Sequence, residues 1–496
     1  MNILLVYPEY PDSFWSFNHA LRFISKKAAV PPLGLITVSA MLPSSWNKKL
    51  VDMNVSTLLD SDIVWADYVF MSAMYIQKES VNEVIDRCVN LNVKIVAGGP
   101  LFSQEYNNYP QISHFILNEA EITLTPFLKD IETGFPKRIY KTEEYANITE
   151  TPVPDYHLLS MKDYAFMNMQ VTRGCPFACD FCEITALLGN KVRIKNTSQI
   201  LNELEVLYNL NWRSNVFIVD DNFIGNKSVI KDNLLPAMRD WMHQHNNPFV
   251  FNTETSINLA DDEKLMSLMV ETGFSSTFIG IETPDEKSLH DCNKVQNNNR
   301  DLLKSVKKIQ NAGLQVSAGF IVGFDSDTST VFQRQIDFIQ QSGIVSAMVG
   351  LLNAPKNTKL YNRLEGENRL TAEPTGSNTD LSINFIPKMA INDLLTGYKR
   401  IIRNIYSTKP YYKRIRQFLL NYNQPSRQNK IELSYLIGFI KSIIIIGIVN
   451  KGRSEYWKFF IWTLFKRPGS FMDAMTFAVY GYHFRTVYGL RGNNYK

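Results

Sequence analysis

The chain has 496 residues, a formal net charge of +4 and five cysteines. Hydrophobic residues make up 45% of it and charged residues 20%, a composition that excludes a disordered protein and allows two or three domains. Five cysteines are too few for a disulfide framework, and the chain starts directly on a buried-strand pattern without a signal peptide, so we expect a cytoplasmic protein with reduced thiols.

The charges are unevenly distributed along the chain. Residues 397–496 contain 18 Lys and Arg residues against three acidic residues, a net charge of +15, and residues 1–396 therefore have a net charge of −11. This pattern predicts a mildly acidic body joined to a basic C-terminal part, which would face an anionic surface or partner.

The first 135 residues alternate short apolar runs with helical patterns. Continuous apolar runs separated by helices are typical of a parallel sheet that is covered on both faces, so we expect a doubly wound, Rossmann-like α/β domain over 1–135. Ligands of such domains lie beyond the carboxyl ends of the strands. The expected strands are 1–8, 48–55, 67–74, 93–100 and 114–121.

A polar, proline-punctuated stretch follows and predicts a linker over 136–166. From residue 167 six strand-like segments alternate with helical patterns. We therefore expect a partial (β/α)6 barrel of the TIM type over 167–360, with its chemistry at the carboxyl ends of the strands. The expected strands are 168–174, 215–223, 249–258, 276–284, 316–324 and 346–355.

Residues 361–496 are expected to form a helical region rich in aromatic and basic residues. Seven basic residues between 399 and 416 are interleaved with four tyrosines, a pattern that favours a basic amphipathic surface against anionic lipid. The apolar run 433–449 has Lys441 as its one charged residue and fits a membrane-surface helix or a buried helix, and a transmembrane helix less well. Basic and aromatic residues also suit RNA, but no added RNA-binding module is recognisable, so we do not expect nucleic acid as a partner.

Three of the five cysteines, Cys175, Cys179 and Cys182, form a C-x3-C-x2-C motif after the first barrel strand. A structural zinc site takes four ligands, and no second Cys or His pair occurs at short spacing. Three thiolates on one loop suit three irons of a [4Fe–4S] cluster whose fourth iron stays open for a small molecule. Chance clustering, or a zinc loop with distant ligands, is the alternative. Cys88 and Cys292 lack partners at metal spacing and are expected to be packing thiols.

With this motif in this position, the chain resembles the radical S-adenosylmethionine (SAM) superfamily. The resemblance implies that the open iron chelates SAM, whose reductive cleavage gives a 5′-deoxyadenosyl radical. It also implies SAM contacts at the strand ends that follow the cysteine motif. These are Asp220, Asp221, Asn222 and Phe223 after the second strand, Glu254 and Ser256 after the third, Glu282 after the fourth, and Gly319, Ile321 and Gly323 in the G-x-I-x-G-x-x-S segment of the fifth. As alternatives, the acidic residues could cap helices or turns and the glycines could serve packing.

The N-terminal domain resembles the cobalamin-binding domain of the B12-dependent class of this superfamily. The whole chain resembles the branch with a C-terminal domain of unassigned role, which includes hopanoid methylases. No D-x-H-x-x-G motif occurs, so no histidine is expected at the lower axial position of the cobalt, and Asn118 stands where relatives often have glycine. A degenerate domain that holds no ligand is the alternative. The resemblance implies cobalamin contacts at Ser72, Ala73, Met74, Gly98, Gly99, Pro100 and Glu119.

These features together predict a B12-dependent radical SAM enzyme that methylates an unactivated carbon of a lipid-like or secondary-metabolite substrate. The adenosyl radical would remove a hydrogen atom and methylcobalamin would deliver the methyl group, so no side chain is assigned a catalytic role. The expected partners are the substrate, a reductant such as flavodoxin or ferredoxin, and a membrane surface that the basic C-terminal region touches. One alternative is a radical SAM enzyme that performs rearrangement, cyclisation or sulfur insertion without methyl transfer. Another is a non-enzymatic, membrane-associated Fe–S scaffold or sensor.

Overall fold

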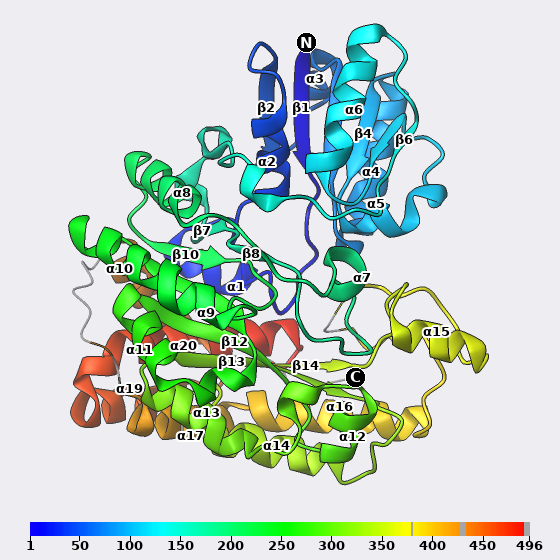
Figure 1. Ribbon diagram of the computed structural model, residues 1–496. Helices are drawn as coiled ribbons and strands as arrows, with labels where there is room; N and C mark the ends of the chain where they lie inside the picture. The colour runs from blue at the N-terminus through cyan, green and yellow to red at the C-terminus, as the bar shows by residue number, and fades with distance from the viewer. Residues whose placement is uncertain (378–379, 424, 426–432, 491–496) are drawn as a thin grey trace.

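The computed structural model describes residues 1–377, 380–423, 425 and 433–490. These residues form an N-terminal α/β part, a barrel of β/α units and a set of C-terminal helices (Figure 1). The N-terminal sheet lies over one end of the barrel, and the C-terminal helices lie along the barrel away from that sheet (Figure 1). The predicted fold class, α/β with parallel sheets and a helical C-terminal region, is confirmed.

The N-terminal sheet has six parallel strands in the order β2-β1-β3-β4-β5-β6. Leu4 and Val6 point into the apolar layer on one face of the sheet, and Ile3 and Leu5 point into the layer on the other. Burial of both faces explains why the strands are continuous apolar runs. The strands are β1 (Asn2–Tyr7), β2 (Asn47–Asp52), β3 (Tyr68–Ser72), β4 (Lys94–Gly98), β5 (His114–Ile116) and β6 (Ile139–Tyr140). The main helices are α2 (Leu33–Met41), α3 (Asp60–Trp65), α4 (Lys78–Asn90), α5 (Pro100–Glu105) and α6 (Ala120–Thr133).

The barrel sheet also has six parallel strands, in the order β14-β13-β12-β11-β10-β7. All six correspond to the predicted strand segments. The strands are β7 (Phe166–Met169), β10 (Asn215–Ile218), β11 (Val250–Thr255), β12 (Phe274–Glu282), β13 (Gln315–Val322) and β14 (Ala347–Leu351). The accompanying helices are α8 (Thr197–Asn209), α9 (Lys227–Val229), α10 (Leu235–Gln244), α11 (Glu263–Thr272), α12 (Glu286–Asp291), α13 (Leu302–Asn311), α14 (Val331–Ser342) and α15 (Lys359–Gly366).

The two edge strands of the barrel, β7 and β14, do not pair with each other, so the barrel is a partial one. The segment around Ala28 runs beside β7, where the backbone N–H groups of Ala165 and Phe166 donate to Ala28 and Ala29 at 3.0 and 2.9 Å. Helix α16 packs against β14. The segment that carries α1 (Asn18–Leu21) and the short helix η1 (Arg22–Ile24) packs in turn against α20 and α18.

The C-terminal helices are built largely from buried aromatic residues. They are α16 (Ile391–Tyr406), α17 (Thr408–Asn421), α18 (Leu433–Ser442), the π-helix η10 (Ile443–Val449), α19 (Arg453–Lys466) and α20 (Phe471–Val487). Helices α16 and α17 pack on α14, and α20 packs on α17 and α19.

The prediction of a basic amphipathic surface over 399–416 is wrong for the tyrosines. The four tyrosines that gave the pattern are buried, and Arg414 is buried among them, donating to the carbonyls of Ile405 and Val345 at 2.8 and 3.3 Å. Burial of a planar cation against aromatic rings explains the interleaving without any lipid. The exposed basic residues of this stretch are Arg400, Arg403, Lys409 and Lys413. Across the described part of the chain, no helix combines the length and the apolar character that crossing a membrane requires.

Candidate functional site

The three motif cysteines lie on a loop that a small ladder closes at its base. Strand β8 (Thr172–Arg173) pairs in antiparallel fashion with β9 (Arg193–Ile194), and the loop between them carries α7 (Ile184–Leu188). Gly174 opens the loop with a φ of 91°, and a Cβ atom there would lie 2.8 Å from the carbonyl oxygen of Lys191. All three thiols are unpaired, and Cys179 is buried.

A second segment, residues 292–297, packs against the cysteine loop. The Asn293 amide donates to the carbonyl of Ala178 at 2.9 Å, and the backbone N–H of Asp180 donates to Cys292 at 3.1 Å. The Gln296 amide lies 3.7 Å from the sulfur of Cys179. These contacts hold the loop in one position relative to the barrel.

Burial and a nearby cation act on the thiols in opposite directions. Burial raises the pKa of Cys182 to about 12, while the nearby Lys294 cation acts in the opposite direction. Burial likewise raises the pKa of Cys175, and a hydrogen bond with Asn222 opposes it. A buried cation beside three thiols matches the negative charge that thiolate-bound iron would bring.

The donor set fits the predicted cluster. Within the described ranges, no three His, Cys, Asp or Glu side chains are placed as ligands of a single ion. A [4Fe–4S] cluster makes a different demand, because each thiolate binds a separate iron. Three thiols on a single loop supply that arrangement.

Asp220 anchors the strand that leads into the cysteine loop. Its carboxylate accepts three hydrogen bonds of 2.8 Å, from the backbone N–H groups of Val171 and Thr172 and from the Thr172 hydroxyl. Burial still raises its pKa to about 7. Both carboxylate oxygens are engaged by the protein, so Asp220 acts on the site by positioning β8.

Asn222 and Ser256 connect the ends of β10 and β11. The Asn222 side-chain oxygen accepts from the backbone N–H and hydroxyl of Ser256 at 3.2 and 3.3 Å, and Asn222 also bonds Cys175. Phe223 points away from this group into the core, where its ring packs 5.1 Å from Phe274. The structure therefore places Asn222 and Ser256 beside the thiols and Phe223 behind them.

Glu254 and Asp221 are the carboxylates that remain open. Burial, with repulsion from Asp221 and Asp220, raises the pKa of Glu254 to about 8, and Glu254 lines the main cavity of the molecule. Burial and the nearby Glu183 raise the pKa of Asp221 to about 6. Carboxyl groups with raised pKa values at the carboxyl ends of barrel strands are typical of functional sites.

Glu282 forms a buried ion pair with Lys294, whose ammonium donates to it at 2.6 Å. Glu282 has a φ of 62°, in the left-handed region that non-glycine residues seldom adopt, at an irregularity between β12 and β13. Burial lowers the pKa of Lys294, but Glu282 and Cys179 raise it by more, so the lysine stays charged. The pair thus fixes a positive charge close to the thiols.

The predicted residues of β13 lie along one side of the barrel. A Cβ atom on Gly319 would lie 3.0 Å from the Phe278 ring, which projects into the cavity. Ile321 packs in a small cluster with Phe181 of the cysteine loop. The backbone N–H of Gly323 donates to Asp327 at 2.8 Å, in the turn that follows the strand.

In the N-terminal part, the predicted cobalamin residues form two tight turns side by side. Gly99 has a φ of 90°, and a Cβ atom there would lie 2.6 Å from the Ser72 hydroxyl and 3.2 Å from the backbone of Ala73. A Cβ atom on Gly98 would meet the carbonyl of Ile116 at 2.7 Å. Pro100 begins α5, and Met74 is 47% exposed and lines the main cavity. Small residues here present mainly backbone at the carboxyl end of the sheet.

Glu119 joins the N-terminal part to the cysteine loop. Arg193 donates to its two oxygens at 2.6 and 2.7 Å, and Arg173 donates to one of them at 3.1 Å. Arg173 precedes Gly174, so this buried network fixes the base of the cysteine loop against the N-terminal sheet. The backbone N–H of Ala146 donates to Glu119 as well, which leaves its carboxylate fully engaged by the protein.

One cavity of 1180 Å³ extends from the carboxyl end of the N-terminal sheet into the barrel. Trp15 lies inside the barrel, with its ring 5.2 Å from Phe278 and its indole N–H directed to the sulfur of Met348 at 3.1 Å. The N-terminal part contributes Tyr10, Asn54, Met74 and Ile76 to the lining of the cavity. The barrel strands contribute Phe217, Asn252, Glu254, Phe278 and Ser317. The remaining wall is mainly apolar and includes Phe17, Phe439, Met475 and Tyr480.

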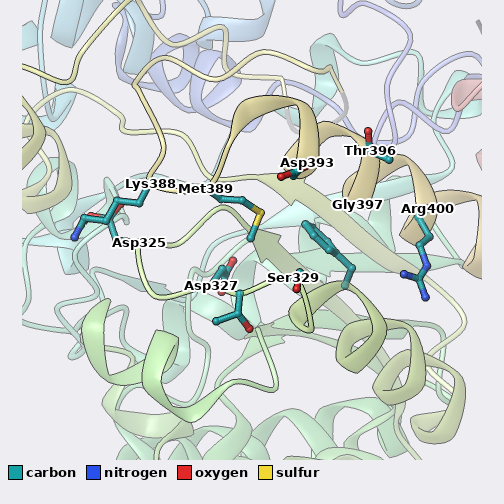
Figure 2. Close-up of a pocket in the computed structure, with 11 residues that line it drawn as sticks. Asp325, Asp327, Ser329, Lys388, Met389, Asp393, Thr396, Gly397 and Arg400 are labelled. Atoms are coloured by element: carbon teal, nitrogen blue, oxygen red, sulfur yellow. The ribbon is translucent and has the colours of Figure 1, made fainter.

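A second pocket, of 670 Å³, lies between the turn after β13 and α16 (Figure 2). Its two main carboxylates are engaged by the protein. Asp325 binds Arg369 at 2.6 Å and Arg363 at 2.7 Å, and Asp327 accepts from Ser288 at 2.8 Å and from the backbone of Gly323. These groups anchor the turn that carries Gly323.

Sequence reasoning missed several residues of this site. Lys294, Asn293 and Gln296 follow α12 without a motif, and Trp15 belongs to a segment that leaves the N-terminal sheet and enters the barrel. Only Trp15 could have been noticed in the sequence, because aromatic residues are concentrated in the stretch PEYPDSFWSF around it. His114 starts β5 at the amino end of the sheet and bonds the carbonyl of Lys137 at 2.7 Å.

Sequence families match two parts of the chain. Residues 169–339 match the radical SAM superfamily, and residues 358–492 match a domain of unknown function, DUF4070. An uncharacterized methyltransferase of Synechocystis is 38% identical over 98% of this chain and 91% of its own length. The hopanoid C-2 methylase of Rhodopseudomonas palustris is 31% identical over 92% of this chain and 88% of its own length.

Solved structures show the same arrangement of parts. The cobalamin-dependent S-adenosylmethionine radical enzyme OxsB, with aqua-cobalamin bound, superposes with a TM-score of 0.62 at 14% identity, over 98% of this chain and 79% of that chain. The radical SAM methyltransferase TsrM of Kitasatospora setae, with cobalamin and a [4Fe–4S] cluster bound, gives 0.60 at 12% identity, over 92% and 98%. At this identity the likeness concerns the fold.

Proposed function

The chain belongs to the cobalamin-dependent radical SAM family, and we propose that it methylates an unactivated carbon of a lipid-like substrate held in the barrel cavity. Membership makes the chain an enzyme and confirms the predicted class, whose cofactors are a [4Fe–4S] cluster, SAM and cobalamin. The observation that carries the proposal is the cavity that runs from Met74, after a strand of the N-terminal sheet, through the inside of the barrel, with Glu254 in its wall.

In this proposal the barrel end holds the cluster and SAM. Cys175, Cys179 and Cys182 bind three irons, and the Lys294 ammonium offsets part of their negative charge. Glu254 faces the cavity with a carboxyl group that can accept or donate a hydrogen bond near neutral pH, which suits a polar part of SAM. Asp220, Asn222 and Ser256 keep the strand ends in register around these groups.

The N-terminal turns hold cobalamin in the same proposal. Gly98 and Gly99 bring backbone to the surface, and Ser72, Ala73 and Met74 form the adjoining turn, so a broad ring can approach without side-chain clashes. Glu119 contributes from behind by fixing the cysteine loop to this sheet. When bound, the three cofactors supply a carbon-centred radical and a transferable methyl group; the protein orients them and excludes water.

The walls of the cavity favour an apolar substrate. Trp15, Phe278, Phe439 and Met475 offer aromatic and aliphatic surface. The charged residues of the lining are Lys27, Arg213, Glu254 and Asp473. The relative named hopanoid C-2 methylase, 31% identical over most of both chains, supports a lipid-like substrate class. A flavodoxin or ferredoxin would supply the reducing electron.

The test is anaerobic turnover of the reconstituted protein with hydroxocobalamin, a chemical reductant, methyl-labelled SAM and candidate polycyclic lipids. We expect both 5′-deoxyadenosine and a lipid that carries the labelled methyl group. Formation of 5′-deoxyadenosine with an unmethylated, rearranged or cyclised product would favour the alternative radical SAM outcome and overturn the methyltransferase proposal.

A further inference from the structure

The helices α18, η10 and α19 expose an unusual amount of apolar surface. Leu436, Ile440, Ile444 and Ile448 recur every four residues, and each is between 49% and 55% exposed. Phe465 of α19 is 78% exposed. We call this surface the apolar face; it consists of Leu436, Ile437, Ile440, Ile444, Ile448, Val449, Ile461, Leu464 and Phe465. Contiguous exposed apolar residues of this kind mark an interaction surface.

The two helical segments of the apolar face are packed against each other. Helix α19 contacts η10, and the Trp457 indole donates to the carbonyl of Gly447 at 2.9 Å. The buried sides of both segments hold Ile446, Tyr456 and Phe459, which belong to the main core. The apolar face is therefore the outer side of a packed element.

The charges around the apolar face are positive. The sequence from 433 to 470 contains six Lys and Arg residues and one acid, Glu455, which pairs with Lys458 at 2.8 Å. Lys451, Arg453 and Lys466 are exposed. An apolar strip with basic neighbours is complementary to an anionic lipid surface, where apolar side chains enter the interface and cations meet headgroups.

The apolar face also adjoins the cavity. On the side of α18 opposite Ile440, the residues Gly438, Phe439 and Ser442 line the cavity. Met472, at the start of α20, lines the cavity and is 40% exposed, and we take its position as the opening of the cavity to the outside. Glu254, at the other end of the barrel strands, lines the same cavity.

We propose that the apolar face docks on an anionic bilayer and that the cavity takes its apolar substrate directly from the bilayer through the opening at Met472. The docking stands on the apolar face and its charges alone, whereas the access route rests on the proposed lipid-like substrate. With no described helix able to span a membrane, the contact is peripheral. The substrate would then reach the radical site from the side away from the N-terminal sheet.

Docking is tested by co-sedimentation of the full-length reconstituted protein with vesicles of phosphatidylcholine alone or with phosphatidylglycerol added. We expect the protein to pellet with the anionic vesicles. For the double variant Ile444→Glu/Ile448→Glu, we expect the partition coefficient between vesicles and buffer to fall at least tenfold. The control Val64→Glu/Val89→Glu alters two residues that are equally exposed, 63% and 50%, on α3 and α4, and should bind as the unaltered chain does. The variant Lys451→Glu/Lys466→Glu should lose only the preference for anionic vesicles.

Several outcomes would overturn the docking. The unaltered protein could remain in the supernatant with anionic vesicles, or the double variant could pellet as well as the unaltered chain. A dimer that light scattering detects and the double variant dissociates, without vesicle binding, would make the apolar face a contact between two copies. If the glutamate variant does not fold by circular dichroism, Ile444→Ser/Ile448→Ser provides the same comparison.

The access route is tested without turnover by a phosphatidylglycerol that carries a diazirine near the end of one acyl chain. After irradiation in vesicles, we expect cross-links in peptides that contain Phe439 and Met475. Met472→Trp should reduce them at least fivefold without changing vesicle binding, and Leu420→Trp, on the exposed side of α17, should not. Vesicle binding with no cross-link in the cavity peptides would refute the route, whereas failure of methyl transfer alone would refute only the proposed function.

Discussion

The carboxyl ends of the two parallel sheets carry the predicted site residues but differ in the groups that they present. The barrel end carries three thiols and two open carboxylates, Asp221 and Glu254, whose pKa values burial raises to about 6 and about 8. The N-terminal end presents backbone and small side chains around Gly99. Two buried carboxylates at this edge are engaged by the protein: Asp52 accepts from Asn54 and Tyr164, and Glu119 binds two arginines.

This difference indicates a division of work between two sheets of the same kind. A site that binds charged and polar groups needs side chains whose hydrogen-bonding capacity is not used up by the protein. A site that receives a broad, rigid ring needs close approach of backbone and little else. The predictions below separate the two sites, because each should fail in its own way when one residue is changed.

The largest effect is expected for Cys179→Ala. Loss of one of three thiolate ligands should remove the cluster and abolish formation of 5′-deoxyadenosine, which iron analysis and chromatography would measure. The matched control is Cys88→Ala, because Cys88 is a buried thiol in the N-terminal part and its loss should cost only about 1 kcal/mol of stability. If the Cys179→Ala variant cleaved SAM at the full rate, the cluster would not be bound by this loop and the proposed role of the barrel end would be wrong.

The second-largest effect is expected for Glu119→Gln, which should lower the stability of the contact between the N-terminal sheet and the cysteine loop. Arg173, Arg193 and Glu119 have side chains no more than 15% exposed, so breaking this network should cost about 3 kcal/mol of unfolding free energy. Chemical denaturation would measure the loss, with the exposed Glu143→Gln as control. Unchanged stability combined with weaker cobalamin binding would instead make Glu119 a direct ligand of the cofactor.

Gly99→Ala should weaken the N-terminal site alone. At a φ of 90° an added methyl group is strained, by roughly 1 to 3 kcal/mol, and it would also meet Ser72 and Ala73. We expect hydroxocobalamin, titrated by its visible absorption, to bind at least tenfold more weakly, while SAM cleavage persists. The control is Gly134→Ala, because Gly134 has a φ of 82° and no atom within 4 Å of the added Cβ. This variant therefore carries the backbone strain without the steric contact, and it lies away from the predicted cobalamin turns.

The sequence predicted much of this division because strands buried on both faces show as unbroken apolar runs. Every strand segment expected from such a run, from 1–8 to 346–355, overlaps a strand of the structure. The loop of Cys175, Cys179 and Cys182 was recognisable because its three thiols lie within eight positions, and their role as cluster ligands stays a prediction. Which strand-end residues contact SAM or cobalamin stays a prediction, and so do the domain boundaries at 135, 166 and 360.

Features that depend on distant partners could not be predicted. Lys294 meets Glu282 and the thiols only through the path of the loop after α12, and Glu119 meets Arg193 across 74 positions of sequence. The prediction of a lipid-facing surface over 399–416 was wrong for a related reason. Its tyrosines and Arg414 have the composition of a lipid-facing surface, but α16 and α17 turn them into the core.

The smallest effect concerns the pH dependence of stability at the barrel end. The pKa of Glu254 is about 8 in the folded chain, above its ordinary value of 4.5, so the folded state retains a proton that the unfolded state has released. Stability should therefore fall as pH rises from roughly 5 to roughly 8, and Glu254→Gln should flatten this decline in melting temperatures of the cofactor-free protein. Asp221→Asn should flatten it only up to about pH 6, in keeping with its lower pKa. An unchanged decline in both variants would mean that these carboxylates are hydrated and ionised, and that the barrel end does not differ from the N-terminal end in this respect.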